Sequence, residues 1–350
     1  MSNSAKSTVV VAKNDDKLKA LQEVMDKTGF LAALESQQQA SGRSKANYLI
    51  AVKPNIMMAY SRQDQSAFTD PELVEYLVDA MVAKGFTNVA VVESQNVFGN
   101  WFKRRDVQTV SDYFGYSGKN YRIVDLTEEM EPYDYGGRLG KHWAGPTWRD
   151  ADFRISFAKN KTHVSSYTTL TIKNVYGCMP LQNKFKEYHK IREFDWPTIE
   201  ALKHFPCHFG FIDAFWSADG LLGFKADYSP RHTKTIIGGE NIIAVEWVGA
   251  KKMGLDPYLS RIFALATTAF GMPEVDWVGN KSTYKDWRNV WDLIDKMMDV
   301  GEEYYTYANW MGFISSEMDP AFPPKIRYRS VFFIRRIMKR ILRLLSRFGL

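Results

Sequence analysis

Short apolar segments alternate with amphipathic segments along most of the chain. The apolar segments are rich in Val, Ile and Ala, which is typical of strands that are buried on both faces. The sequence predicts strands over residues 7–12, 48–52, 88–92, 121–125, 153–158, 208–212, 235–238 and 275–278. Helices are expected over residues 16–40, 70–85, 101–114, 197–205, 240–253, 257–270 and 286–299. This alternation predicts an α/β fold with mostly parallel sheets and helices on both faces.

The alternation is interrupted by a segment rich in Gly, Tyr, Trp and Pro, residues 126–150. Long connections without periodicity are uncommon inside compact domains, so this segment is expected to be a lid or a junction between domains. We therefore predict a two-lobed protein with an N-terminal α/β lobe at residues 1–150 and a second α/β lobe at residues 151–324. A polar cleft is expected between the lobes, and residues 325–350 form a separate tail.

Polar residues follow two of the predicted parallel strands. Lys53-Pro54-Asn55 comes directly after strand 48–52, and Glu93-Ser94-Gln95 comes after strand 88–92. Ligands of parallel sheets bind beyond the carboxyl ends of the strands. Both tripeptides are therefore candidate site segments by position, and Lys53 and Asn55 are predicted to bind a cofactor or ligand.

The densest polar stretch of the chain lies within residues 159–190. Its cationic and amide residues include Lys159, Asn160, Lys161, His163, Lys173, Asn174, Lys184 and His189, with several hydroxyl residues between them. Lys and His donate charged hydrogen bonds, and Asn, Ser and Thr complete the geometry, so the stretch suits a small anionic ligand. The alternative is a solvated loop whose hydroxyl groups cap turns.

Composition excludes several kinds of site. Two cysteines, Cys178 and Cys207, are too few for a disulfide scaffold, a four-thiolate zinc site or a cysteine-ligated iron–sulfur cluster. The six histidines show no compact metal-binding spacing. No segment approaches the ~18 consecutive apolar residues of a membrane span, and no secretory leader is evident, so a cytoplasmic location is expected.

The positive charge of the chain is concentrated at its end. The formal net charge is +6, but residues 325–350 contain nine Lys and Arg and no acid, so the rest carries −3. Nucleic-acid binding by the body is therefore not expected. From Val331 onward, aliphatic residues fall on one helical face and arginines on the other, which predicts an amphipathic helix on an anionic membrane surface. The alternative is a helix docked on the body or on a partner subunit.

An ordered set of motifs runs through the chain. It comprises VKPN at 52–55, VES at 92–94, KTH…TIKNVYG at 161–177, His189, IDA at 212–214, GGEN…AVEWVG at 238–249 and FGMPEVDWVGN at 270–280. This set resembles the domain of unknown function 362 family over residues 7–280. Many relatives carry an added ferredoxin-like cysteine cluster, which this chain lacks, so the resemblance implies no iron–sulfur cluster here.

A second resemblance concerns the spacing His163-x9-Lys173-x15-His189. It is similar to a stretch of the nickel-pincer lactate racemase family. The resemblance implies that Lys173 holds the cofactor covalently, that His189 ligates the metal and that His163 is an acid/base. A nickel-pincer nucleotide or another divalent metal is therefore a candidate cofactor. The chain has Glu93-Ser94 where that family has a further catalytic histidine, which argues against two-base racemisation.

Two functions follow from these observations. The first is an enzyme of isomerase or oxidoreductase type that acts on a small anionic or hydroxylated substrate. His163 would be its acid/base, His189 its metal ligand, and Lys173 would act in catalysis as well as hold the cofactor together with Asn174. The second is a peripheral membrane accessory protein that holds an anionic cofactor for a partner.

Overall fold

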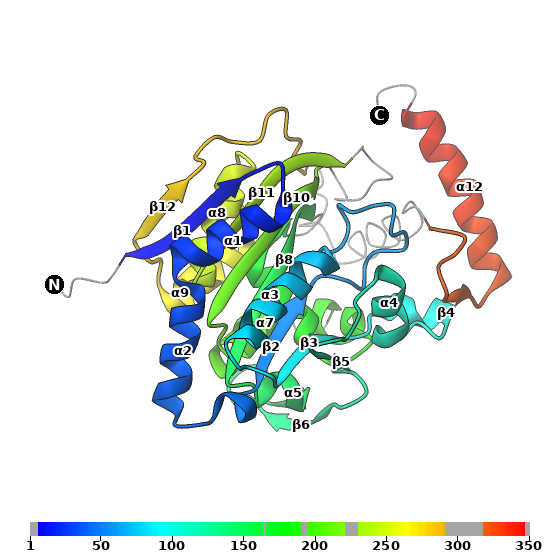
Figure 1. The fold of residues 1–350 in the computed structure, drawn as a ribbon. Helices are drawn as coiled ribbons and strands as arrows, with labels where there is room; N and C mark the ends of the chain where they lie inside the picture. Colours follow the sequence, from blue (N-terminus) through cyan, green and yellow to red (C-terminus); the bar gives the residue numbers. More distant parts are fainter. Residues whose placement is uncertain (1–5, 164–165, 191–194, 221–229, 291–317, 347–350) are drawn as a thin grey trace.

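The computed structural model describes residues 6–163, 166–190, 195–220, 230–290 and 318–346 (Figure 1). Its centre is a nine-stranded sheet in the order β12-β1-β11-β10-β8-β2-β3-β5, with β9 paired to β8. The strands are β1 (Ser7–Lys13), β2 (Ile50–Pro54), β3 (Val89–Glu93), β5 (Arg122–Asp125), β8 (Phe153–His163), β9 (Tyr167–Thr169), β10 (Phe209–Ala218), β11 (Arg231–Gly239) and β12 (Val275–Gly279). The pairs β1–β11, β10–β11 and β8–β9 are antiparallel and the others are parallel, so the prediction of a mostly parallel sheet is confirmed.

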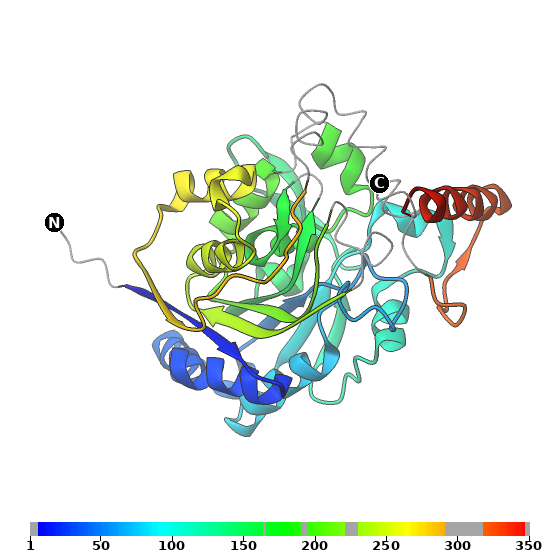
Figure 2. The same cartoon turned by 90° about the horizontal axis from the view of Figure 1, so that it is seen from above.

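Helices cover both faces of this sheet, as predicted (Figure 2). The first group is α1 (Lys17–Thr28), α2 (Phe30–Ser41), α3 (Pro71–Ala83) and α4 (Val107–Phe114), and the second is α6 (Thr171–Val175), α7 (Asp195–His204), α8 (Ile242–Lys252) and α9 (Arg261–Phe270). Val10 of β1 belongs to the same apolar cluster as Leu21 of α1, whereas Val9 clusters with Val245 of α8. Successive strand residues thus point into opposite cores, which is why this strand is a continuous apolar run.

Several predicted elements differ in detail. The segment 16–40 forms two helices, because Gly29 between them takes a left-handed backbone conformation with φ of 67°. The predicted irregular segment 126–150 contains the hairpin β6 (Glu131–Asp134)–β7 (Lys141–Ala144) and the short helix α5 (Pro146–Arg149). Residues 286–290 are not helical, and the remainder of the helix predicted over 286–299 lies outside the described residues.

Short turns of helix complete the body. They are the 3-10 helices η1 (Lys45–Asn47), η2 (Val97–Trp101), η3 (Tyr176–Cys178) and η5 (Pro257–Leu259), and the π-helix η4 (Phe185–Lys190). π-Helices are rare and often occur at functional sites. η3 follows α6 directly along the chain, and η4 begins at Phe185.

Residues 159–163 continue strand β8 instead of forming a loop. Lys159 pairs with Asp213 of β10, and Lys161 pairs with Thr169 of β9. Lys159 and Asn160 are at most 1% exposed. The alternative of a solvated loop is therefore wrong for these residues. The sequence did not predict this burial, because the side chains are polar. In the fold, backbone pairing holds the strand, and partners from other elements satisfy its buried polar groups.

The main sheet contains strands from both sides of residue 150. β1 from the N-terminal part pairs with β11 and β12 from the second part. β2 likewise pairs with β8. The two predicted lobes therefore both contribute strands to one sheet. The domain boundary at residue 150 stays a prediction.

The predicted C-terminal amphipathic helix is present as α12 (Arg329–Ser346). It follows the short strand β13 (Lys325–Ile326), which pairs with β4 (Phe102–Lys103) outside the main sheet. Figure 1 shows α12 at the side of the molecule opposite α9 and β12. None of the helices in the described part of the chain combines the length and the apolar character that crossing a bilayer requires.

Candidate functional site

A cavity of about 160 Å³ lies where β2, β3 and β8 end and α6 begins. The described residues that line it are Lys53, Asn55, Met57, Met58, Glu93, Ser94, Asn96, Val97, Phe98, Lys161, His163, Thr169, Lys173, Asn174, Tyr176, Gly177 and Lys184. Because the three strands are parallel neighbours, their carboxyl ends lie at the same edge of the sheet. Five predicted site residues are therefore brought together: Lys53, Asn55, His163, Lys173 and Asn174.

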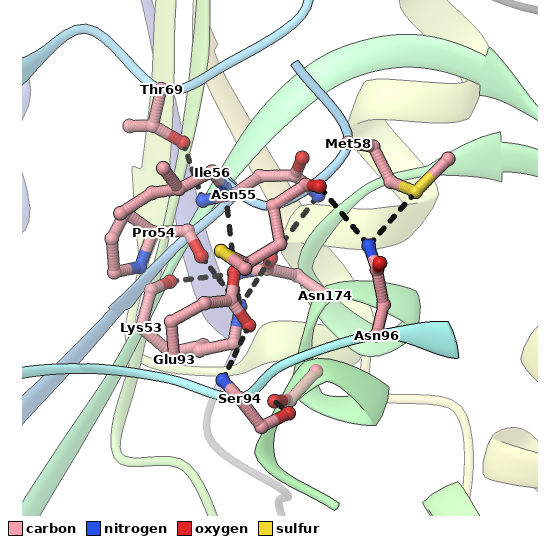
Figure 3. Close-up of polar contacts among 12 residues, drawn as sticks. Lys53, Pro54, Asn55, Ile56, Met58, Thr69, Glu93, Ser94, Asn96 and Asn174 are labelled. Carbon is pink, nitrogen blue, oxygen red and sulfur yellow. Dashed lines mark hydrogen bonds and ion pairs between the residues drawn. The ribbon is translucent and has the colours of Figure 1, made fainter. Parts of the chain in front are cut away.

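A buried ion pair forms the wall between β2 and β3 (Figure 3). The Nζ of Lys53 lies 3.0 Å from Oε2 of Glu93, and the two side chains are 1% and 6% exposed. Lys53 also donates to the carbonyl of Pro54 at 2.6 Å, and Glu93 accepts from the backbone N–H groups of Ile56 and Ser94. A buried ion pair persists only when its remaining hydrogen-bonding positions are filled in this way.

Asn174 joins α6 to the end of β2 (Figure 3). Its Nδ2 donates to the carbonyl of Lys53 at 2.7 Å and to Oγ of Ser156 at 3.2 Å. Its Oδ1 accepts from Nζ of Lys53 at 3.4 Å and from Nδ2 of Asn55 at 3.5 Å. Asn174 thus fixes the short helix that carries Lys173.

Three further lysines reach the same cavity. Burial lowers the pKa of Lys161 to about 8 and the pKa of both Lys173 and Lys184 to about 7. The carboxylates of Asp64 and Asp195 act in the opposite direction on Lys161 and Lys173, but desolvation is the larger effect. The Nζ of Lys173 lies 4.3 Å from the ring centroid of Tyr176. These amines therefore gain and lose protons close to neutral pH.

Two polar residues of the lining differ in how their side chains are hydrogen-bonded. Thr169 is 4% exposed, and its Oγ1 has no hydrogen-bond partner among the described residues. Asn96 is held by Arg105, whose Nη1 donates to Asn96 Oδ1 at 2.8 Å. Arg105 is itself buried and stacks over Tyr60 at 5.0 Å. A buried hydroxyl without a partner is unfavourable, so Thr169 suits hydrogen bonding to a bound molecule.

The described residues do not assemble a metal centre. His163 lines the cavity, but within the described ranges no three His, Cys, Asp or Glu side chains lie close enough together to hold a metal ion. His189 lies in the π-helix η4, and its side chain is outside the described part of the structure. The lysines fit an anionic group, and ammonium groups repel a cation.

Glu246 of α8 is a site residue that sequence analysis did not identify. It is 1% exposed, and its Oε2 accepts from the backbone N–H of Ile172 at 2.8 Å and from Oγ1 of Thr171 at 3.0 Å. The carboxylate thus caps the N-terminus of α6, the helix that bears Lys173. Burial raises the pKa of Glu246 to about 7. The available signal was a single acid within the apolar run 242–249.

We expect Glu246→Gln to flatten the pH dependence of stability. The folded-state pKa of Glu246 exceeds the unfolded value of about 4.3, so its contribution is present below that pH and is lost as the pH rises through about 7. Between pH 5 and pH 8 the wild type should lose roughly 1–3 kcal/mol more unfolding free energy than the variant. Urea unfolding at both pH values measures this, with the exposed Glu240→Gln as control. Equal losses in the wild type and Glu246→Gln would show that burial does not raise the pKa of Glu246.

Comparison with known proteins supplies the family. The sequence model described as "Domain of unknown function (DUF362)" matches residues 50–251, which include β2, β3, β8 and α6. No curated protein matches the chain. The lactate racemase apoprotein from Thermoanaerobacterium thermosaccharolyticum is a similar solved structure, with 13% identity and a TM-score of 0.40 over 70% of this chain and 56% of that chain. The chain thus spans little more than half the length of that protein. Because the sequence model covers more than half of the chain, the protein belongs to the family described as Domain of unknown function (DUF362).

Proposed function

We propose that this protein is an enzyme that acts on a small anionic molecule, a carboxylate or a phosphate, in the cavity at the ends of β2, β3 and β8. The observation that carries the proposal is the charge of the lining. Lys53, Lys161, Lys173 and Lys184 line the cavity, and Glu93 is the one carboxylate among the described lining residues. Charged hydrogen bonds from lysine bind carboxylates and phosphates strongly.

The size of the cavity favours a small substrate. Its volume of about 160 Å³ lies below the ~300 Å³ at which pockets for drug-sized ligands begin. A molecule of a few heavy atoms could use Lys161 and Lys184 for its anionic group. Thr169 Oγ1, which has no hydrogen-bond partner among the described residues, would bind a hydroxyl or carbonyl group of that molecule.

The amines also suit proton transfer. General acid–base catalysis works best when the pKa of the catalytic group lies near the working pH. The pKa of Lys173 is lowered to about 7, so part of the population holds a neutral amine that can accept a proton. A bound anion favours the ammonium form, which can return that proton. His163 of the same lining is the candidate partner for the second transfer.

We expect anion binding to take up protons and to weaken as the pH rises. Below about pH 7 the lysines are protonated and bind the anion, and between pH 7 and pH 9 they lose this charge. Isothermal titration with inorganic phosphate and with acetate, in two buffers of different ionisation enthalpy, measures both effects. Lys173→Met should weaken binding about tenfold or more, because a hydrogen bond to a charged group contributes ~1.5–3 kcal/mol.

Lys186→Met is the matched control for this titration. Lys186 is exposed, lies two residues from Lys184 and does not line the cavity. Its removal changes the net charge of the protein equally but should leave affinity within about twofold, since exposed charges act weakly at a distance. Anion binding without proton uptake, or equal effects of the two substitutions, would refute the proposed role of the buried lysines.

Turnover distinguishes an enzyme from a protein that only holds an anion for a partner. We expect the wild type to exchange hydrogen for deuterium from D2O at C2 of one or more small 2-hydroxy acids, or at C3 of 2-oxo acids. Proton NMR follows this exchange. Lys173→Met and His163→Asn should each slow this exchange about a hundredfold or more. Saturable binding of the same acids without exchange would favour the accessory role.

A nickel-pincer nucleotide is the second candidate for the bound anion, and the cavity of about 160 Å³ would have to widen to admit it. Its support is that His163 and Lys173, the first two members of the motif, line one cavity. Held by Lys173, such a group would supply hydride-transfer chemistry. We expect intact-mass spectrometry of protein from its native host to show a covalent increment on Lys173 and retained nickel in the native spectrum. A bare polypeptide mass without nickel would remove this candidate and leave the anion-binding proposal standing.

A further inference from the structure

An exposed apolar stripe runs along α12. Its members are Phe333, Ile334, Ile337, Ile341 and Leu344, whose exposed fractions range from 41% to 63%. The last four follow one another at intervals of three or four residues, so they share one side of the helix. Single exposed apolar residues are ordinary, but a continuous stripe of large ones marks a surface that binds something.

Another side of α12 packs on the body and fixes how the helix is turned. Val331 and Met338 pack against the apolar cluster of the body, and Arg335 is 5% exposed. The preceding segment is fixed as well, because Ile326 pairs with Phe102 of β4. In both ribbon views α12 lies at the edge of the molecule (Figures 1 and 2). The stripe therefore begins beside this packed side of the helix and stays exposed along its length.

Arginines border the stripe. Arg329, Arg336 and Arg340 are exposed, and in the described part of the chain no carboxylate lies within ion-pair distance of any of them. The helix sequence Arg329–Ser346 contains no Asp or Glu. The outer surface of α12 thus combines large aliphatic and aromatic groups with unneutralised positive charge.

We propose that α12 docks the protein on an anionic lipid surface. The stripe would enter the boundary between headgroups and acyl chains, and the flanking arginines would bind lipid phosphates. Each basic residue near such a surface strengthens binding about fivefold. This surface is separate from the cavity, so the inference does not depend on the function proposed for it.

Charge favours lipid over a second copy of the chain. A symmetric contact between two α12 helices would bring the positively charged arginines of the two copies together. Neither helix contains an acid to neutralise them. Lipid phosphates supply the missing negative charge, and acyl chains accept the apolar stripe. Nucleic acid would satisfy the arginines but would leave the stripe in water.

The test is co-sedimentation of the full chain with vesicles. We expect binding to vesicles of phosphatidylcholine with 30% phosphatidylglycerol (roughly the composition of a strongly anionic leaflet). Binding to phosphatidylcholine alone should be much weaker. Raising the salt to about 0.5 M should reduce binding to the anionic vesicles, because screening shortens the reach of the arginine charges. Equal binding to neutral vesicles, or none to anionic ones, would overturn the proposal.

Two double variants probe the two halves of the surface. Ile337→Asp with Ile341→Asp should abolish sedimentation, and Arg336→Glu with Arg340→Glu should weaken it about 25-fold or more. Matched controls on exposed residues away from α12 are Leu259→Asp and Lys19→Glu, which should bind as the wild type does. Circular dichroism confirms that each variant is folded.

Docking of α12 on a second copy of the chain would give a different result. Light scattering would then show a dimer of the wild type that the Ile337→Asp, Ile341→Asp variant converts to a monomer, with no sedimentation on anionic vesicles. That result would overturn the lipid assignment. A monomeric wild type that sediments in proportion to phosphatidylglycerol content would support it.

Discussion

The structure depends on how it buries ammonium groups at one edge of its sheet. Taking a lysine charge out of water costs several kcal/mol unless other groups replace the water. Lys53 is compensated by Glu93, and Lys159, farther back in β8, by Asp213 at 2.8 Å. At Lys161, Lys173 and Lys184 desolvation is the larger effect, and their pKa values fall toward neutrality. The cavity is therefore lined by amines that titrate near neutral pH, and the proposed anion site rests on this feature.

The precision of this arrangement rests on a helix of five residues. α6 is too short to be stable alone. Ile172 and Val175 anchor it by apolar packing, and two polar contacts fix its position. Asn174 binds the end of β2, and Glu246 of the neighbouring helix α8 caps α6. The Asn174 amide and the Glu246 carboxylate mainly fix the position of α6. Their net contribution to stability is small, because each hydrogen bond replaces one that the group made to water in the unfolded chain. Lys173 is consequently held by two elements far apart in the sequence.

The cavity and the tail helix belong to one apolar cluster. Met57 and Met58 line the cavity and pack in the same cluster as Met338 of α12. Phe322, which precedes β13, contacts Tyr60 edge to face at 5.8 Å. Val97 and Phe98 of the cavity lining also lie in η2, directly before β4, the strand that pairs with β13 ahead of α12.

Apolar periodicity and turn chemistry are properties of single segments, so the sequence alone determined the strands, most helices and the amphipathic tail. The parallel order of the strands then placed Lys53 and Asn55 at a ligand-binding edge. Lys173 and Asn174 were identified from a dense polar stretch. Only the tertiary structure decided that residues 159–163 are buried, that Glu93 neutralises Lys53 across 40 positions and that Glu246 caps α6. Such contacts depend on which strands become neighbours in the fold. The residue type by itself does not show whether a lysine is buried or solvated.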